Sequence, residues 1–155
     1  MNENLKNYFE QLTKQGFLKQ EEIGLDQIKA LLVSAKKNLM AANKTLEIDE
    51  ETCYTMAYSC VLKLGRALIF LHGFRPDDGQ QHKTTIEAAF FILGDDYKNL
   101  FFVFDKMRQK RNQFTYDPLF PLSIAEVKEA LKNADNFLSE VRNFIKTKNP
   151  QLSLF

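Results

Sequence analysis

Apolar residues recur three or four positions apart along most of the chain, which is the period of an α-helix. The pattern predicts six helices, and two of them carry especially regular apolar seams. The third helix is apolar over a wide arc, which is typical of a central helix that several neighbours contact. The predicted helices cover residues 5–15, 25–46, 49–71, 81–93, 97–115 and 124–145.

Turn-forming residues lie between these helices. Gly16 and Gly94 follow helical patterns as expected C-caps, a loop with Pro76 is expected at residues 72–79, and Ser123 opens the last helix with a capping box. Strand-type alternation is nearly absent. Short connections between helices predict an all-α fold, an up-and-down antiparallel bundle of five to six helices. We expect an N-terminal helix and linker at 1–22, the bundle at 23–147 and a flexible C-terminal tail at 148–155.

Composition agrees with a single packed domain. The chain has 155 residues, of which 45% are hydrophobic, with 14 Phe and no Trp. No apolar run approaches the roughly 20 residues that a membrane span needs, and the polar first residues lack the apolar region of a signal peptide, so we expect a cytoplasmic protein without a membrane partner. Cys53 and Cys60 lie about 10 Å apart along one predicted helix, too far for a disulfide. We expect buried thiols in a reducing compartment.

Charge and motifs exclude several classes of site. The formal net charge is +1, from 21 basic and 20 acidic side chains, so any nucleic-acid role requires a local basic patch. His72 and His82 are the only histidines, and no zinc pattern, glycine-rich phosphate loop or nucleophile motif is present. The sequence therefore predicts neither a metal site nor a cofactor.

The apolar stripe of the fifth helix, from Leu100 to Met107, continues at the same spacing into Arg108 and Arg111. The core-facing side of this helix is therefore predicted to change from Phe to Arg within one turn. Arginine is rarely buried without an anionic or hydrogen-bonded partner. One interpretation is a site for phosphate, which guanidinium groups bind bidentately. The alternative is structural, with the arginines joining helices through carboxylates; the candidates are Asp105, Asp117, Glu87 and Glu126.

Two residues from other helices are possible neighbours of this segment. Arg66 lies among apolar residues of the third helix, so it either extends its guanidinium to the surface or faces a polar pocket. His82 lies one turn before Ile86 on the fourth helix, where it either packs or caps, or takes part in the site.

The sequence MRQKRNQFTYDP at residues 107–118 resembles the HEPN domain family, together with YTMAYSCVLKLGRALIFLHGFRP and QHKTTIEAA upstream. The resemblance covers roughly residues 25–145. It implies a small helical bundle, commonly a homodimer, in a family that includes metal-independent ribonucleases and the partners of minimal nucleotidyltransferases in bacterial toxin–antitoxin modules. The family motif is an Arg, usually followed by Asn, Asp or His, with a His five positions after the Arg. Arg111 and Asn112 match, and Tyr116 stands at the place of the His.

This departure implies a degenerate ribonuclease centre, because a Tyr with a pKa near 10 is a poor general base. By resemblance, Arg111 stabilises the phosphorane, Asn112 orients the phosphate, and Tyr116 or His82 assists proton transfer. The expected phosphate-binding neighbours are Arg108, Arg66 and Lys110. We expect a protein that associates with RNA or a nucleotide, as one half of a toxin–antitoxin module. The alternative is an active metal-independent endoribonuclease.

The C-terminal peptide QLSLF is similar to the peptide by which bacterial replication and repair proteins dock on the DNA sliding clamp. This resemblance implies a non-enzymatic adaptor whose apolar side chains fill a pocket of the clamp. The alternative is that these side chains fold back on the bundle or pack in a dimer. The residues concerned are Gln151, Leu152, Leu154 and Phe155.

Overall fold

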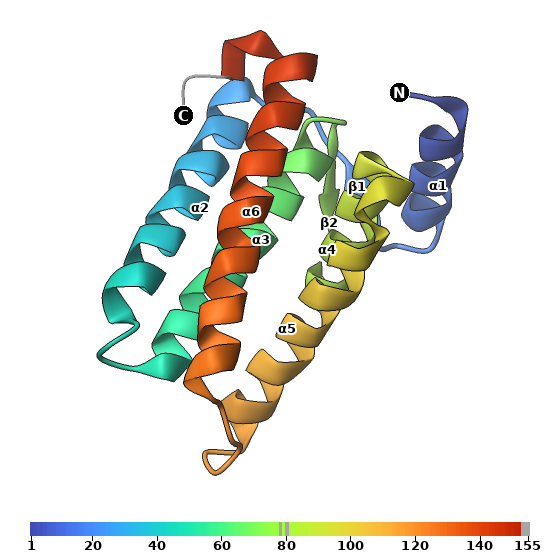
Figure 1. The fold of residues 1–155 in the computed structure, drawn as a ribbon. Helices are drawn as coiled ribbons and strands as arrows, with labels where there is room; N and C mark the ends of the chain where they lie inside the picture. The colour runs from blue at the N-terminus through green and yellow to red at the C-terminus, as the bar shows by residue number, and fades with distance from the viewer. Residues whose placement is uncertain (78, 80, 153–155) are drawn as a thin grey trace.

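The protein is an all-α bundle in the computed structural model, which describes residues 1–77, 79 and 81–152 (Figure 1). Six α-helices and two 3-10 turns, η1 (Asp95–Tyr97) and η2 (Pro150–Leu152), form within the described residues. The predicted helical bundle is confirmed. The helices are α1 (Glu3–Lys14), α2 (Leu25–Thr45), α3 (Glu50–Phe70), α4 (Gln81–Leu93), α5 (Lys98–Tyr116) and α6 (Ile124–Lys148).

Helix α3 is the centre of the bundle, as its wide apolar arc predicts. Twelve of its residues are buried, more than in any other helix of the described chain, and α2, α4, α5 and α6 all pack against it. The predicted C-caps are also confirmed, because Gly16 and Gly94 end α1 and α4 with φ angles of +76° and +96°. That left-handed region favours glycine.

Gly65 allows α4 to approach α3 closely. A Cβ atom at this position would lie 3.0 Å from Cγ2 of Thr85 and 3.4 Å from Cβ of Ala89. Tyr58 lies two turns before Gly65 on the same face of α3, and His82 lies one turn before Thr85 on α4. Tyr58 and His82 therefore lie on the two helix faces that approach each other at this contact.

The loop predicted at residues 72–79 is in part a strand, which corrects the sequence prediction. β2 (Phe74–Pro76) pairs antiparallel with β1 (Leu18–Gln20), and Lys19 lies opposite Arg75. Three-residue strands are too short to produce a readable alternation. This small sheet ties the N-terminal segment to the bundle. A second hydrophobic cluster forms there, from Leu5, Phe9, Leu12, Leu18, Ile69, Phe74 and Ala88.

The C-terminal tail is packed on the bundle as far as Leu152. The Leu152 side chain is 1% exposed and belongs to the main core, whereas Gln151 is exposed. This differs from a free tail beginning at residue 148, and it agrees for Leu152 with the alternative that the tail folds back. Leu154 and Phe155 lie outside the described residues.

Both cysteines are buried and free, as expected. Burial raises the pKa of the Cys60 thiol to about 12, and the negative charge of Asp135 adds to the rise. No helix in the described part of the chain combines the length and apolar character needed to cross a membrane.

Candidate functional site

The buried face of α5 continues beyond the arginines, which corrects one sequence prediction. Phe104, Met107 and Phe114 are buried, and Arg108 and Arg111 are half-buried beside them. The core-facing side therefore stays aromatic and apolar beyond the arginines, because Phe114 lies on it two turns after Met107. The seven-residue spacing from Met107 to Phe114 was a readable signal for this residue.

Tyr58 and His82 form a hydrogen-bonded pair where α3 and α4 meet. The Oη atom of Tyr58 lies 3.2 Å from Nδ1 of His82, and Tyr58 is only 2% exposed. Sequence analysis did not select Tyr58 as a site residue. The one sign of its role in the sequence was a Tyr hydroxyl on the side of an otherwise apolar helix. A buried Tyr hydroxyl usually has a hydrogen-bond partner.

Three arginines from α3 and α5 act electrostatically on this pair. Burial lowers the pKa of His82, and the charges of Arg66, Arg111 and Arg108 lower it further, in that order. Burial raises the pKa of Tyr58, whereas the charges of Arg108, Arg111 and Arg66 oppose this rise. The fold thus brings together four residues that the sequence predicted for the site. We refer to Tyr58, Arg66, His82, Arg108 and Arg111 as the arginine–histidine cluster.

The guanidinium groups of the cluster differ in their partners. Nε of Arg108 lies 2.8 Å from Oδ1 of Asp105, so Arg108 has one of the predicted carboxylate partners, but both residues belong to α5 and the pair does not join two helices. Nη1 of Arg111 donates to Asn112 Oδ1 at 3.4 Å, which is long for a hydrogen bond. No ion pair between described residues includes Arg111 or Arg66.

Arg66 faces a polar region, as one of its two interpretations predicted. Its Nη2 donates to Oε1 of Gln81 at 2.9 Å. Its Nε is buried and has no hydrogen-bond partner among the described residues. A buried donor without a partner costs about 1–3 kcal/mol, so an acceptor bound next to Arg66 would remove that cost.

Lys110 joins α5 to α6. Its Nζ forms an ion pair and hydrogen bond with Oε1 of Glu126 and lies 5.5 Å from the centre of the Phe120 ring. The hydrogen bonds from Lys110 and then from Ser123 lower the pKa of Glu126 to about 2. Ser123 and Glu126 form the predicted capping box. The Lys110 ammonium is therefore occupied by a structural partner.

The side chain of Tyr116 points away from the arginine–histidine cluster. It is the last residue of α5 and is 84% exposed. Five helical residues rotate the side-chain direction by about 140°, so Tyr116 and Arg111 project from different sides of α5. Asn112 is half-buried next to Arg111. η2 lies at the end of the bundle opposite the turn between α5 and α6 (Figure 1), so residues 150–152 do not adjoin Tyr116.

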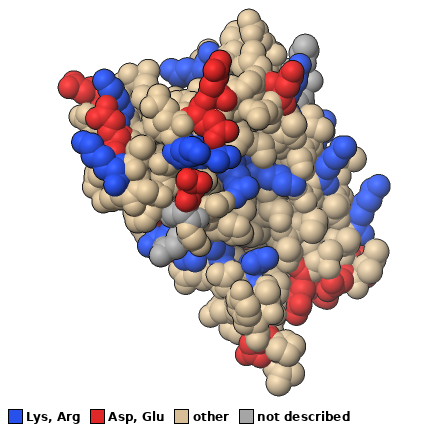
Figure 2. All heavy atoms as spheres, turned by 180° about the vertical axis from the view of Figure 1, so that it is seen from behind, with Lys and Arg blue, Asp and Glu red and all other residues tan. Residues whose placement is uncertain are grey.

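The surface carries local concentrations of charge despite the net charge of +1. Figure 2 shows Lys and Arg side chains as a broken band across the middle of the face behind the view of Figure 1. The described residues contain no group of three or more His, Cys, Asp or Glu that could hold a metal ion.

Comparison with known proteins gives one family match. The family model described as HEPN domain matches residues 28–144. This range contains every residue of the arginine–histidine cluster, and it leaves α1 and β1 outside. No curated protein matches the chain.

Proposed function

Because the chain belongs to the HEPN domain family, which is associated with nucleotides and RNA, we propose that the arginine–histidine cluster binds a phosphate group of RNA or of a nucleotide. The observation that carries this proposal is that the positive charges of three arginines, Arg66, Arg111 and Arg108, all act on the imidazole of His82. Guanidinium groups bind phosphate oxygens bidentately and keep their charge at every physiological pH.

Two details of the cluster support phosphate as the ligand. Arg111 has no carboxylate partner among the described residues, so its charge is available. The buried Nε of Arg66 lacks an acceptor within the same part of the chain, and a phosphate oxygen would provide one. Arg108 is partly neutralised by Asp105, so it contributes less to binding than the other two.

Binding is tested with a fluorescent single-stranded RNA and the full chain in EDTA, by fluorescence anisotropy. Arg111→Ala should weaken binding roughly tenfold or more, because a charge-assisted bidentate contact is removed. Lys146→Ala is the matched control, since Lys146 is an exposed cation of α6, and it should change affinity less than about twofold. Equal affinities of the parent and Arg111→Ala would refute the proposal.

A second candidate function is metal-independent RNA cleavage, which the position and pKa of His82 favour. The lowered pKa keeps the imidazole neutral near pH 7, as a general base must be. If Nδ1–H donates to the Tyr58 oxygen, the lone pair of Nε2 accepts the proton of an RNA 2′-hydroxyl. The 2′-oxygen then attacks phosphorus, the bond to the 5′-oxygen breaks, and this oxygen leaves with a proton from water. The His82 imidazolium gives its proton to the resulting hydroxide, which restores the neutral base. Arg111 stabilises the phosphorane charge, and Asn112 orients the phosphate.

In this scheme His82 performs the proton transfer that the family motif assigns to the position of Tyr116. Cleavage in EDTA should yield a 2′,3′-cyclic phosphate, His82→Gln should abolish it, and Tyr116→Phe should retain it. Binding without cleavage would remove this second function and leave the first intact. Cleavage that survives His82→Gln but not Tyr116→Phe would reassign the base.

HEPN domains often form dimers, and we propose a homodimer that covers the turn between α5 and α6. Tyr116 and Leu119 are 84% and 89% exposed there. Multi-angle light scattering tests the mass, and Leu119→Asp should shift it toward the monomer.

A minimal nucleotidyltransferase is the proposed protein partner of a toxin–antitoxin module, and co-purification with the product of a neighbouring gene tests it.

Docking of the C-terminal peptide on a sliding clamp is a separate proposal. Because Leu152 is buried, binding through it would require η2 to detach from the core. Calorimetry of the parent and of a chain lacking residues 151–155 tests the proposal, and equal heats with the clamp would remove it.

A further inference from the structure

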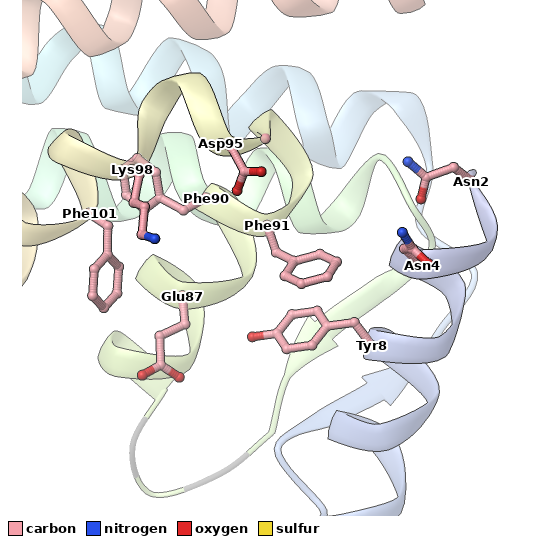
Figure 3. A pocket seen from close by; sticks show the side chains of 10 residues that line it. Asn2, Asn4, Tyr8, Glu87, Phe90, Phe91, Asp95, Lys98 and Phe101 are labelled. Carbon is pink, nitrogen blue, oxygen red and sulfur yellow. The ribbon is translucent and has the colours of Figure 1, made fainter.

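A pocket lies between α1, α4 and the start of α5 (Figure 3). It is lined by residues outside the arginine–histidine cluster. It encloses about 450 Å³, which is within the usual range for small-ligand sites. The wall from α1 lies outside the residues that the family model matches. The pocket therefore depends on a segment that this chain adds to the family domain.

Helix α1 holds its contribution to the pocket in a fixed position. Phe9 is fully buried and packs edge-on against Phe74, with ring centroids 4.9 Å apart. The neighbouring Tyr8 stacks on Phe91 of α4, with centroids 4.0 Å apart and an interplanar angle of 15°. Figure 3 shows Tyr8 and Phe91 on one side of the pocket and Phe101 on the other, with Glu87 between them.

The pocket combines aromatic rings with carboxylates. Glu87 and Asp95 both line it. Burial raises the pKa of Tyr8 to about 12, and the negative charge of Glu87 adds to the rise, so Glu87 acts at the Tyr8 hydroxyl. Among the described residues, the ion pair of Glu87 is a long one, at 3.8 Å, with the exposed Lys83. Phe91 is 44% exposed, so part of its ring surface is accessible.

We propose that this pocket binds an organic cation, a guanidinium or alkylammonium group. Aromatic faces attract cations through the ring quadrupole, and the carboxylates of Glu87 and Asp95 supply the opposite charge. The same pocket is lined by Lys98, whose ammonium repels a bound cation. Removing Lys98 should therefore tighten binding of a cation, whereas it would weaken binding of an anion. The prediction thus has opposite signs for the two kinds of ligand.

The test is an NMR titration of the full chain with N-acetyl-arginine amide, with spermidine, and with the neutral N-acetyl-norleucine amide. The cationic probes should show upfield ring-current shifts of the methylenes next to the charge. Glu87→Gln and Phe91→Leu should each weaken binding about three- to fivefold, and Lys98→Ala should tighten it about twofold. The unfolding midpoint of each variant is measured to check that it is folded. Arg111→Ala, which lies outside the pocket, should bind the cationic probes like the parent.

The two cationic probes distinguish the source of the ligand. Tighter binding of the arginine amide assigns the pocket to a side chain of a protein partner, and tighter binding of spermidine assigns it to a free polyamine. Three results would each overturn the proposal: the neutral probe binds as tightly as the cations, neither cation binds, or Lys98→Ala binds the cations more weakly than the parent.

Discussion

Gly65→Ala tests whether the contact between α3 and α4 positions the site. The added Cβ would lie 3.0 Å from Cγ2 of Thr85, which is closer than side-chain carbons normally approach, whereas the 3.4 Å to Cβ of Ala89 is tolerable. Thr85 is fully buried, so its methyl cannot move into solvent. Either α4 moves away from α3, or the Thr85 side chain leaves its preferred rotamer.

Two opposing effects determine the size of the change. Replacing a helical glycine by alanine stabilises a helix by about 0.5–1 kcal/mol. Overpacking a closed core costs about 1–3 kcal/mol. The free energy of unfolding of Gly65→Ala should therefore fall by about 1 kcal/mol, which lowers the unfolding midpoint by about 2–4 °C for a chain of this size.

Thr85→Ser supplies the control, because it removes the contacting Cγ2 and keeps the hydroxyl. In that background Gly65→Ala should no longer destabilise, which gives a coupling free energy of about 1–2 kcal/mol in a double-mutant cycle. Urea unfolding followed by circular dichroism measures all four chains. A Gly65→Ala protein as stable as the parent, with no coupling to Thr85, would show that the contact at Gly65 does not hold α4 against α3. The displacement of α4 should also weaken RNA binding by Gly65→Ala, and the double variant should recover it.

Three further predictions follow from residues described above. Leu152→Ala should lower the free energy of unfolding by about 2–4 kcal/mol, because it opens a cavity in the core, whereas the exposed control Gln151→Ala should stay within about 0.5 kcal/mol in the same urea titration. The folded-state pKa of Glu126 is lowered to about 2. The ionised Glu126 side chain therefore stabilises the fold fully above the pKa of the unfolded chain, and this stabilisation is lost as the pH falls toward 2. Glu126→Gln should flatten this part of the curve of unfolding free energy against pH. Arg66→Ala should raise the pKa of His82 toward its usual value, because it removes a nearby positive charge, and an NMR titration of the His82 ring protons that shows no rise would contradict the placement of Arg66.

The sequence predicted the helices well because α2, α4, α5 and α6 each bury an apolar face against α3, and α1 buries its apolar face in the second cluster. The seam of α2 predicted seven inward-facing residues, of which five are buried: Ile28, Leu32, Ala35, Leu39 and Ala42. At the two ends of the helix the prediction is less accurate, because Leu25 is 41% exposed and Leu46 is partly buried. The β1–β2 sheet could not be predicted in the same way. The sheet forms by pairing of residues 18–20 with residues 74–76, and a contact between residues so distant in sequence leaves no local pattern.

The site was predictable in its residue types more than in its geometry. The position of Arg111 in the helical stripe identified it, and the seven-residue spacing from Met107 also indicated that Phe114 continues the core. The approach of His82 to Tyr58 depends on the distance between α3 and α4, which pack closely at Gly65. A helical period gives the face of a side chain and not the separation of two helices. The role of Tyr116 stays a prediction.

The burial of Cys53 and Cys60 in α3 has a practical consequence. Both thiols are fully buried, and a Cys60 pKa of about 12 leaves almost no reactive thiolate in the folded protein. Alkylation by iodoacetamide can then proceed only after the central helix is exposed. Because α3 contacts α2, α4, α5 and α6, that exposure requires the whole bundle to open. The rate of thiol labelling therefore reports global unfolding under native conditions, without an introduced label.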